Sequence, residues 1–174
     1  MPDSHETAND CGIPNKCART VPGWLVALDN GPTIALFVMG TLLLWPLLLG
    51  IFAITFATYC VLSIVMFWAF ICPCCHHFGT GACPCGYGKV APKFFKAKPS
   101  HDFRKVFKFN IAIMLPVWLV PLIGGAYVLY TAFGMLYLAL FFAFCIDGFA
   151  VIPLISILVG CKDCEINDQC PWRT

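Results

Sequence analysis

Two long apolar blocks constrain the fold of this chain more than any other feature. The first covers residues 33–72 and the second covers residues 109–160, with a polar segment between them. The hydrocarbon core of a bilayer is about 30 Å thick and a helix rises about 1.5 Å per residue, so roughly 20 residues cross it. Each block is therefore long enough for two crossings. We expect an all-α integral membrane protein with four transmembrane helices arranged as two hairpins.

The composition agrees with a membrane protein. Hydrophobic residues make up 60% of the 174 residues and charged residues only 11%, which is far from the range of soluble globular domains. The first hairpin is expected to turn near residues 49–53 and the second near residues 130–134, where glycine and small residues let the chain bend. The amino terminus lacks a basic region followed by a short apolar core, so we expect no cleavable secretory signal.

The blocks divide the chain into five parts. These are a polar, cysteine-containing amino-terminal tail (1–32), the first hairpin (33–72), a Cys/His-rich and basic loop (73–108), the second hairpin (109–160) and a cysteine-containing carboxyl-terminal tail (161–174). The loop holds most of the basic residues, all between Lys89 and Lys108. The positive-inside rule predicts that this loop is cytoplasmic, and four crossings then place both termini on the same side.

Cysteine is the second unusual feature. The chain has 12 cysteines, and all except Cys60 and Cys145 fall at the end of the expected bundle where the loop and both tails meet. The cytosol keeps thiols reduced, so a dense group of them indicates metal ligands or redox groups rather than structural disulfides. We therefore expect a Cys/His-rich cap formed by the loop and the tails.

Two Cys-x-x-Cys pairs are the main candidate metal ligands. Cys72 and Cys75 form one pair at the end of the first block, and Cys161 and Cys164 form the other after the second block. Four thiolates can hold a structural zinc ion in tetrahedral geometry or an iron-sulfur cluster. Alternative ligands close by are Cys74, Cys83, Cys85 and His76.

One short stretch of the loop supports metal binding. The sequence CPCGYGK at residues 83–89 resembles a rubredoxin-type metal knuckle, Cys-Pro-x-Cys-Gly-x-Gly-Lys, over seven residues but with one position fewer between the cysteines. In such knuckles backbone amides turn toward the sulfur and help to neutralise the thiolate charge, and glycine allows the tight turn. The resemblance implies that Cys83 and Cys85 bind metal.

A redox function is the first alternative. The sequence CPCC at residues 72–75 resembles the Cys-Pro-x-Cys of thiol oxidoreductases, and a four-helix membrane bundle with such pairs at its rim is similar to the quinone-linked disulfide-forming enzymes. Those enzymes act on the oxidising side of the membrane, whereas the lysines predict a cytosolic motif. An inverted topology would favour disulfides and this function. The chain has no other catalytic motif, so we expect no further enzyme activity.

Transport of a soft metal ion is the second alternative. Asp147 is the only acidic residue deep in either block, and Cys145 lies two residues before it. An ionisable group in hydrocarbon is costly, so these two residues predict an intramembrane site for a metal ion, a proton or a quinone. Cys60 lies in the first block. Buried cysteine is most often a small apolar residue, and we expect that role for Cys60 and for Cys145 if no such site exists.

The basic part of the loop predicts a lipid partner. Lysines alternate with phenylalanines between Lys89 and Phe109, which favours a surface segment bound to anionic lipid rather than to nucleic acid. With almost no soluble domain, the chain is expected to act with a partner membrane protein or a second copy of itself. We therefore expect an accessory or electron-transfer subunit of a membrane complex.

Overall fold

The structure, a computed structural model, describes residues 20–75, 77–98 and 103–160. These residues form helices and loops and contain no strand. Four helical segments are long and apolar enough to cross a bilayer: Gly23–Leu44, Leu47–Cys74, Val106–Thr131 and Met135–Leu158. The chain is therefore an integral membrane protein with four apolar spans, as its composition predicts.

Helix α1 (Gly23–Leu44) starts well before the apolar block that predicts it. Its first turns contain Asp29 and Asn30, which the sequence assigns to the polar tail 1–32 rather than to a span. The helix tolerates these residues because the Asn30 amide donates to the carbonyl of Val26, 2.8 Å away, one turn earlier. The first span thus begins at Gly23 and not at residue 33, where the sequence places its start.

The first turn overlaps the expected residues 49–53 at Leu49 and Gly50 and begins a few residues earlier. A 3₁₀ segment, η1 (Leu47–Gly50), links α1 to α2 (Ile51–Phe70). Pro46 has no N–H to continue the α1 ladder, and the next residues Leu48, Leu49 and Gly50 have φ values of 42°, 55° and 83°. The helix break at the proline sets the position of the turn.

The second half of the chain contains two long helical segments. Helix α4 (Phe103–Thr131) ends before a short turn at residues 132–134. One helical run follows, made of α5 (Met135–Ile146), the π-helical η5 (Asp147–Val151), α6 (Ile152–Ile155) and the π-helical η6 (Ser156–Gly160). Between the halves lie η2 (Cys72–Cys74), α3 (Tyr87–Val90) and η3 (Ala91–Lys93).

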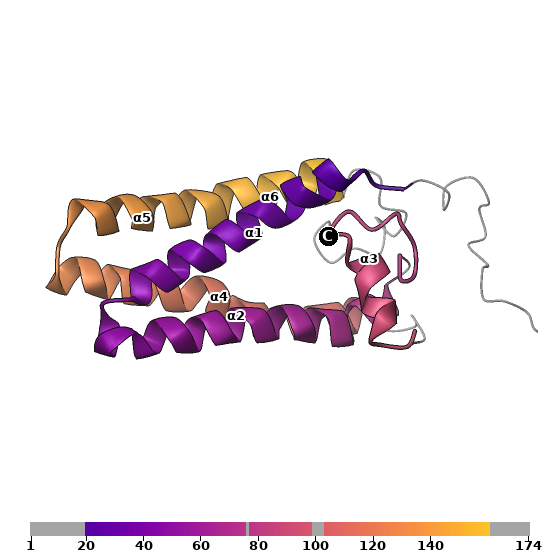
Figure 1. Cartoon of the computed structure of the whole chain (residues 1–174), viewed down its shortest axis with the longest axis horizontal. Helices are drawn as coiled ribbons and strands as arrows, with labels where there is room; N and C mark the ends of the chain where they lie inside the picture. The colour runs from indigo at the N-terminus through magenta and orange to yellow at the C-terminus, as the bar shows by residue number, and fades with distance from the viewer. Residues whose placement is uncertain (1–19, 76, 99–102, 161–174) are drawn as a thin grey trace, which may run out of the picture.

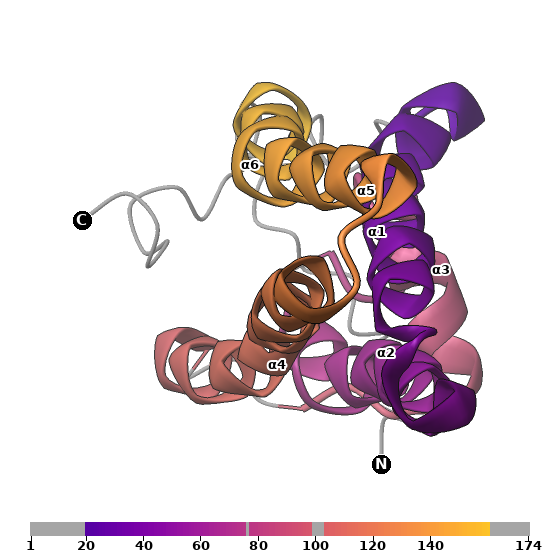
Figure 2. The ribbon, with the colours of Figure 1, turned by 90° about the vertical axis from the view of Figure 1, so that its left-hand side faces the viewer.

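Helix α1 is the central element of the bundle. It packs against α2 and α4 and against the run from α5 to η6 (Figures 1 and 2). Both chain turns lie at one end of the bundle, and the segment with α3 lies at the other end (Figure 1). The interior consists of two apolar clusters, Leu36, Leu43, Val117 and Phe144 in one and Leu44, Ala53, Phe56 and Cys60 in the other.

Gly40 lets three helices meet closely on α1. A Cβ atom at this position would lie 2.8 Å from the Phe56 ring of α2 and 2.9 Å from Pro121 Cγ of α4. Small residues at such contacts let membrane helices approach, because close packing rather than water exclusion holds them together.

We expect Gly40→Ala to lower the free energy of unfolding by about 1–3 kcal/mol, since the added methyl group overpacks a filled contact. Gly23→Ala is the matched control on the same helix, because no atom lies within 4 Å of its Cβ position. Its effect should stay within about 0.5 kcal/mol. Unfolding by sodium dodecyl sulfate in mixed micelles, followed by circular dichroism, measures both; equal effects would contradict the close contact at Gly40.

Candidate functional site: the thiol loop

The segment of residues 71–98, here called the thiol loop, is held at one end of the bundle by hydrogen bonds to the start of α1. The Val21 amide, just before α1, donates to the Gly81 carbonyl at 2.9 Å. The side-chain amide of Asn30 in α1 donates to the Cys85 carbonyl at 3.0 Å. The Lys98 amide donates to the Pro73 carbonyl at 2.9 Å, which closes the loop on its own start.

Glycines allow the loop to fold back tightly on itself. Gly86 has a φ of 74°, which L-residues rarely adopt, and its amide donates to the Cys83 carbonyl at 3.0 Å. Gly88 is buried, and a Cβ atom there would lie 2.5 Å from the His77 carbonyl oxygen and 2.8 Å from Cys83 Cβ. No other residue fits at position 88 without moving the backbone.

The Cys83 sulfur is the point on which this turn converges. It accepts a hydrogen bond from the Cys85 thiol and from the backbone amides of Cys85, Tyr87 and Gly88. The Cys85 donor and these amides outweigh the effect of burial and lower the pKa of the Cys83 thiol to about 6. Backbone donors around one sulfur match the arrangement that the knuckle resemblance implies, although only Pro84 separates the two cysteines.

Cys85 is the proton donor of this pair. Its hydrogen bond to Cys83, its burial and the charge of Asp29, with which it also hydrogen bonds, raise the pKa of the Cys85 thiol well above its usual value. Within the pair, the Cys85 thiol is thus the donor and the Cys83 sulfur the acceptor, so deprotonation is easier at Cys83 than at Cys85. The Cys85 proton lies between two acceptors, the Cys83 sulfur and the Asp29 carboxylate of α1.

Tyr87 covers the thiols on the side of α2. Its ring makes edge-to-face contacts with Phe67 at 6.0 Å and with Trp68 at 5.6 Å between ring centroids. Burial, followed by the charges of Cys85 and Asp29, raises the pKa of the Tyr87 hydroxyl, so it stays neutral. The ring contributes an apolar wall to the site.

The other predicted thiols lie where the second span ends. Cys72 and Cys74 are buried and Cys75 is half-buried. Cys72 interacts electrostatically with Cys83 of the knuckle and with Cys75. The thiols of Cys72, Cys74, Cys83 and Cys85 are not in disulfides.

Only part of the predicted four-thiolate site lies within the described residues. Cys161, Cys164 and His76 lie outside the described residues, so the pairing of Cys72 and Cys75 with them stays a prediction. Within the described ranges, no three or more His, Cys, Asp or Glu side chains are grouped so that they could hold a metal ion. The thiol loop therefore brings Cys83 and Cys85 together but does not form a complete ligand set from the described residues.

The predicted intramembrane site consists of Asp147 and Cys145, which lie close together along the fourth span. Asp147 begins the π-helical η5 and Cys145 precedes it in α5. The Asp147 Oδ2 atom is buried without a hydrogen-bond partner, and Cys145 packs against the first apolar cluster. Cys60 is buried in the second cluster, which agrees with an apolar packing role. In the described part of the spans, Asp147 belongs to no group of three or more His, Cys, Asp or Glu side chains that could hold a metal ion.

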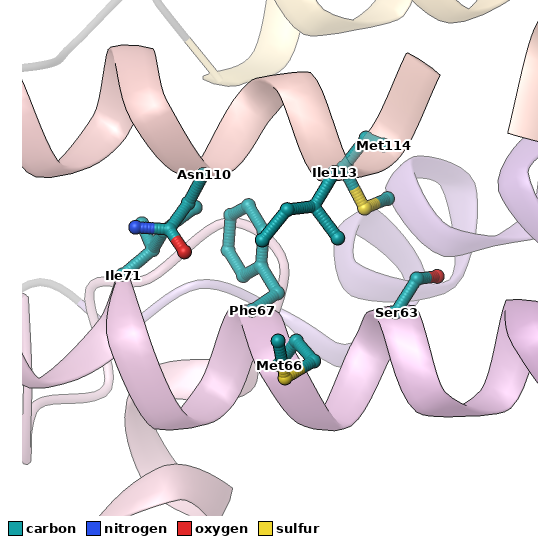
Figure 3. A pocket seen from close by; sticks show the side chains of 7 residues that line it. All are labelled: Ser63, Met66, Phe67, Ile71, Asn110, Ile113 and Met114. Atoms are coloured by element: carbon teal, nitrogen blue, oxygen red, sulfur yellow. The ribbon is translucent and has the colours of Figure 1, made fainter. Parts of the chain in front are cut away.

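A narrow crevice between α2 and α4 offers no stronger candidate (Figure 3). Its polar residues are Ser63 and Asn110, and each donates to the backbone of its own helix, to Cys60 at 2.7 Å and Val106 at 2.8 Å. The other side chains that line it are apolar. None of its lining residues is titratable. The thiol loop is therefore the stronger candidate for a reactive or ligand-binding site.

Two residues of the site were not expected from the sequence. Asp29 was assigned to the amino-terminal tail, and Tyr87 was treated only as part of the knuckle sequence. The sequence does contain a feature that points to Asp29 as a site residue. Asp29 and Asn30 are adjacent polar residues just before the long apolar run. Such residues at the end of a span tend to meet other polar groups there.

We expect the rate of Cys83 alkylation by iodoacetamide to rise with pH and reach half its plateau at about pH 6, because the pKa of this thiol is lowered to about 6. An ordinary exposed thiol reaches half its plateau near pH 8.5. The measurement is peptide-resolved mass spectrometry on the full chain in detergent. A midpoint above pH 8 for Cys83 would contradict the hydrogen bonding at its sulfur.

Gly88→Ala is the matching structural variant. The added methyl group must displace the His77 carbonyl and the Gly88 amide, so the Cys83 midpoint should move to higher pH. Gly23→Ala, which meets no atom within 4 Å, should leave it unchanged.

The chain matches no family model, no curated protein and no solved structure. Among the described residues, the hydrogen-bonded Cys83 sulfur of the thiol loop is the group best suited to chemistry.

Proposed function

We propose that this chain is a small integral membrane protein whose thiol loop binds a thiophilic metal ion at the cytosolic face, as an accessory or electron-transfer subunit of a membrane complex. The observation that carries the proposal is the set of backbone amides from Cys85, Tyr87 and Gly88 that hydrogen bond to the Cys83 sulfur. Amides in this arrangement stabilise a thiolate before any metal arrives, and the thiolate is the form that binds metal.

The ligands in this proposal start from the knuckle. Cys83 is the first ligand, and Cys85 becomes the second when it gives up its proton, as metal binding requires. Cys72 and Cys75, which the sequence predicts as one of the two main ligand pairs, lie at the end of the second span, and Cys72 interacts electrostatically with Cys83. The further candidates are Cys74, His76, Cys161 and Cys164.

Zinc and an iron-sulfur cluster are the two candidate metal centres for the thiol loop. Four thiolates suit either one. Zinc would link the loop to the spans as a structural centre, whereas an iron-sulfur cluster would give the subunit an electron-transfer role. The cytosolic side follows from the seven basic residues between Lys89 and Lys108.

We expect protein purified without air to contain metal, and the Cys83→Ser and Cys85→Ser variants to lose it. Cys60→Ala is the control, because Cys60 lies in the middle of α2 and is buried in the second apolar cluster. Elemental analysis gives the metal content, and acid-labile sulfide with visible absorption separates an iron-sulfur cluster from zinc. If Cys83→Ser retains the full metal content, the knuckle is not the metal site.

Thiol–disulfide exchange is a second candidate, favoured by one specific observation. The Cys85 thiol hydrogen bonds both to the Cys83 sulfur and to the Asp29 carboxylate. This combination provides a nucleophilic thiolate, a second thiol close to it and a base for the second thiol's proton.

The exchange can be written with these three groups. The Cys83 thiolate attacks a substrate disulfide, which forms a mixed disulfide and releases one substrate thiolate. Cys85 then transfers its proton to Asp29 and attacks the Cys83 sulfur. A Cys83–Cys85 disulfide forms, the second substrate thiolate leaves, and the substrate has gained two electrons.

This candidate predicts that Cys85→Ser traps the mixed disulfide on Cys83. Asp29→Asn should slow its resolution at least tenfold while leaving the first attack by Cys83 nearly unchanged, because the amide cannot take the Cys85 proton. The measurement is rapid-quench mass spectrometry with a glutathione disulfide substrate. Equal resolution rates for the parent and Asp29→Asn would argue against a role for Asp29. Metal content stays the separate test of the first proposal.

A further inference from the structure

The last part of the thiol loop, residues 93–98, forms an exposed strip of lysine and phenylalanine beside the membrane-spanning helices. Lys93, Lys96 and Lys98 are exposed, and Phe94 exposes 69% of its surface. The strip is attached to the bundle through Ala91, which is fully buried and accepts hydrogen bonds from the Phe94 and Phe95 amides.

Contacts with the end of α2 fix the level of this strip in the membrane. The Lys98 Nζ atom lies 3.5 Å from the Ala69 carbonyl and 5.5 Å from the centre of the Phe70 ring. Both residues belong to the last turn of α2, within the candidate span Leu47–Cys74. The strip therefore runs along the boundary where a span leaves the hydrocarbon.

The lysines of the strip have different surroundings. Lys98 donates to a carbonyl at the carboxyl end of α2, where a cation also interacts favourably with the helix dipole. Lys93 and Lys96 are exposed beside the exposed Phe94. Residues 71–98 include no acidic residue, so no carboxylate of the thiol loop itself neutralises these lysines.

We propose that residues 93–96 bind anionic phospholipid headgroups of the bilayer that holds the chain, with Phe94 inserted among the acyl chains and Lys93 and Lys96 at the phosphates. Phenylalanine beside a span end reaches the acyl boundary, and long lysine side chains reach the headgroups. Each lysine near an anionic surface strengthens binding by roughly fivefold at low salt. This surface is independent of the metal and redox chemistry of the loop.

The experiment uses full-length Phe94→Trp protein in nanodiscs. Its fluorescence, taken as the difference from the parent chain, is quenched by brominated phosphatidylserine or by brominated phosphatidylcholine at equal content. We expect at least twofold stronger quenching by the serine lipid. Lys93→Gln with Lys96→Gln should remove this preference. Lys89→Gln is the control and should keep it, because the Lys89 side chain lies against Gly81.

Several results would overturn the proposal. Equal quenching by both lipids would mean that the strip does not select anionic headgroups, and no quenching by either would place the introduced indole ring in water. Loss of the preference on adding inorganic phosphate would identify a site for free phosphate instead of lipid. Loss on adding polyuridylate would identify a nucleic-acid surface. A preference that falls in 0.5 M sodium chloride but survives phosphate and polyuridylate supports the lipid surface.

Discussion

The structure depends on one constraint, which is that polar groups in hydrocarbon must find partners within the protein. The polar side chains of the spans largely follow it by bonding back to their own helix. Thr41, Thr58 and Thr131 each donate to the carbonyl four residues earlier, at 2.7–2.9 Å. The Tyr59 hydroxyl instead donates to the Ile113 carbonyl, which links α2 to α4. Polar residues can therefore occur in these spans without opening the bundle, and the remaining surface faces lipid with apolar side chains.

The same constraint explains why the chemistry lies at one end of the molecule. Asp29 and Asn30 are the polar residues that α1 carries into its first turns, and both find partners in the thiol loop. The loop in turn needs these partners, because its tight turns partly bury backbone and thiol groups, which then have less access to water for hydrogen bonding. The contacts between α1 and the loop thus satisfy polar groups on both sides at once. A loop packed in this way can hold a thiolate at a fixed position beside the membrane.

The sequence predicts the four apolar spans because hydrocarbon thickness and helix rise leave little choice for such long apolar blocks. The first turn lies close to the stretch 49–53 that the sequence predicts and includes Gly50, but Pro46 makes it begin a few residues earlier. The sequence assigns Asp29 to a tail, because composition alone treats a charged residue as outside a span. The contact of Asp29 with Cys85 joins residues that are far apart along the chain, so no local pattern predicts this pair. The knuckle is local, so a seven-residue resemblance was enough to suggest amides at the sulfur.

Both proposed chemistries act on the same proton. Metal binding at Cys85 removes its proton, and resolution of a mixed disulfide by Cys85 removes it as well. In either case the hydrogen bond between Cys85 and Asp29 loses its shared proton or transfers it to the carboxylate. If the sulfur and the carboxylate both carry charge, they repel each other across the contact between the loop and α1, unless a metal ion compensates. Because α1 packs against all the other spans, a change at this contact acts on the helix at the centre of the bundle. A change in the protonation of Cys85 would therefore act first on the contact between the thiol loop and α1.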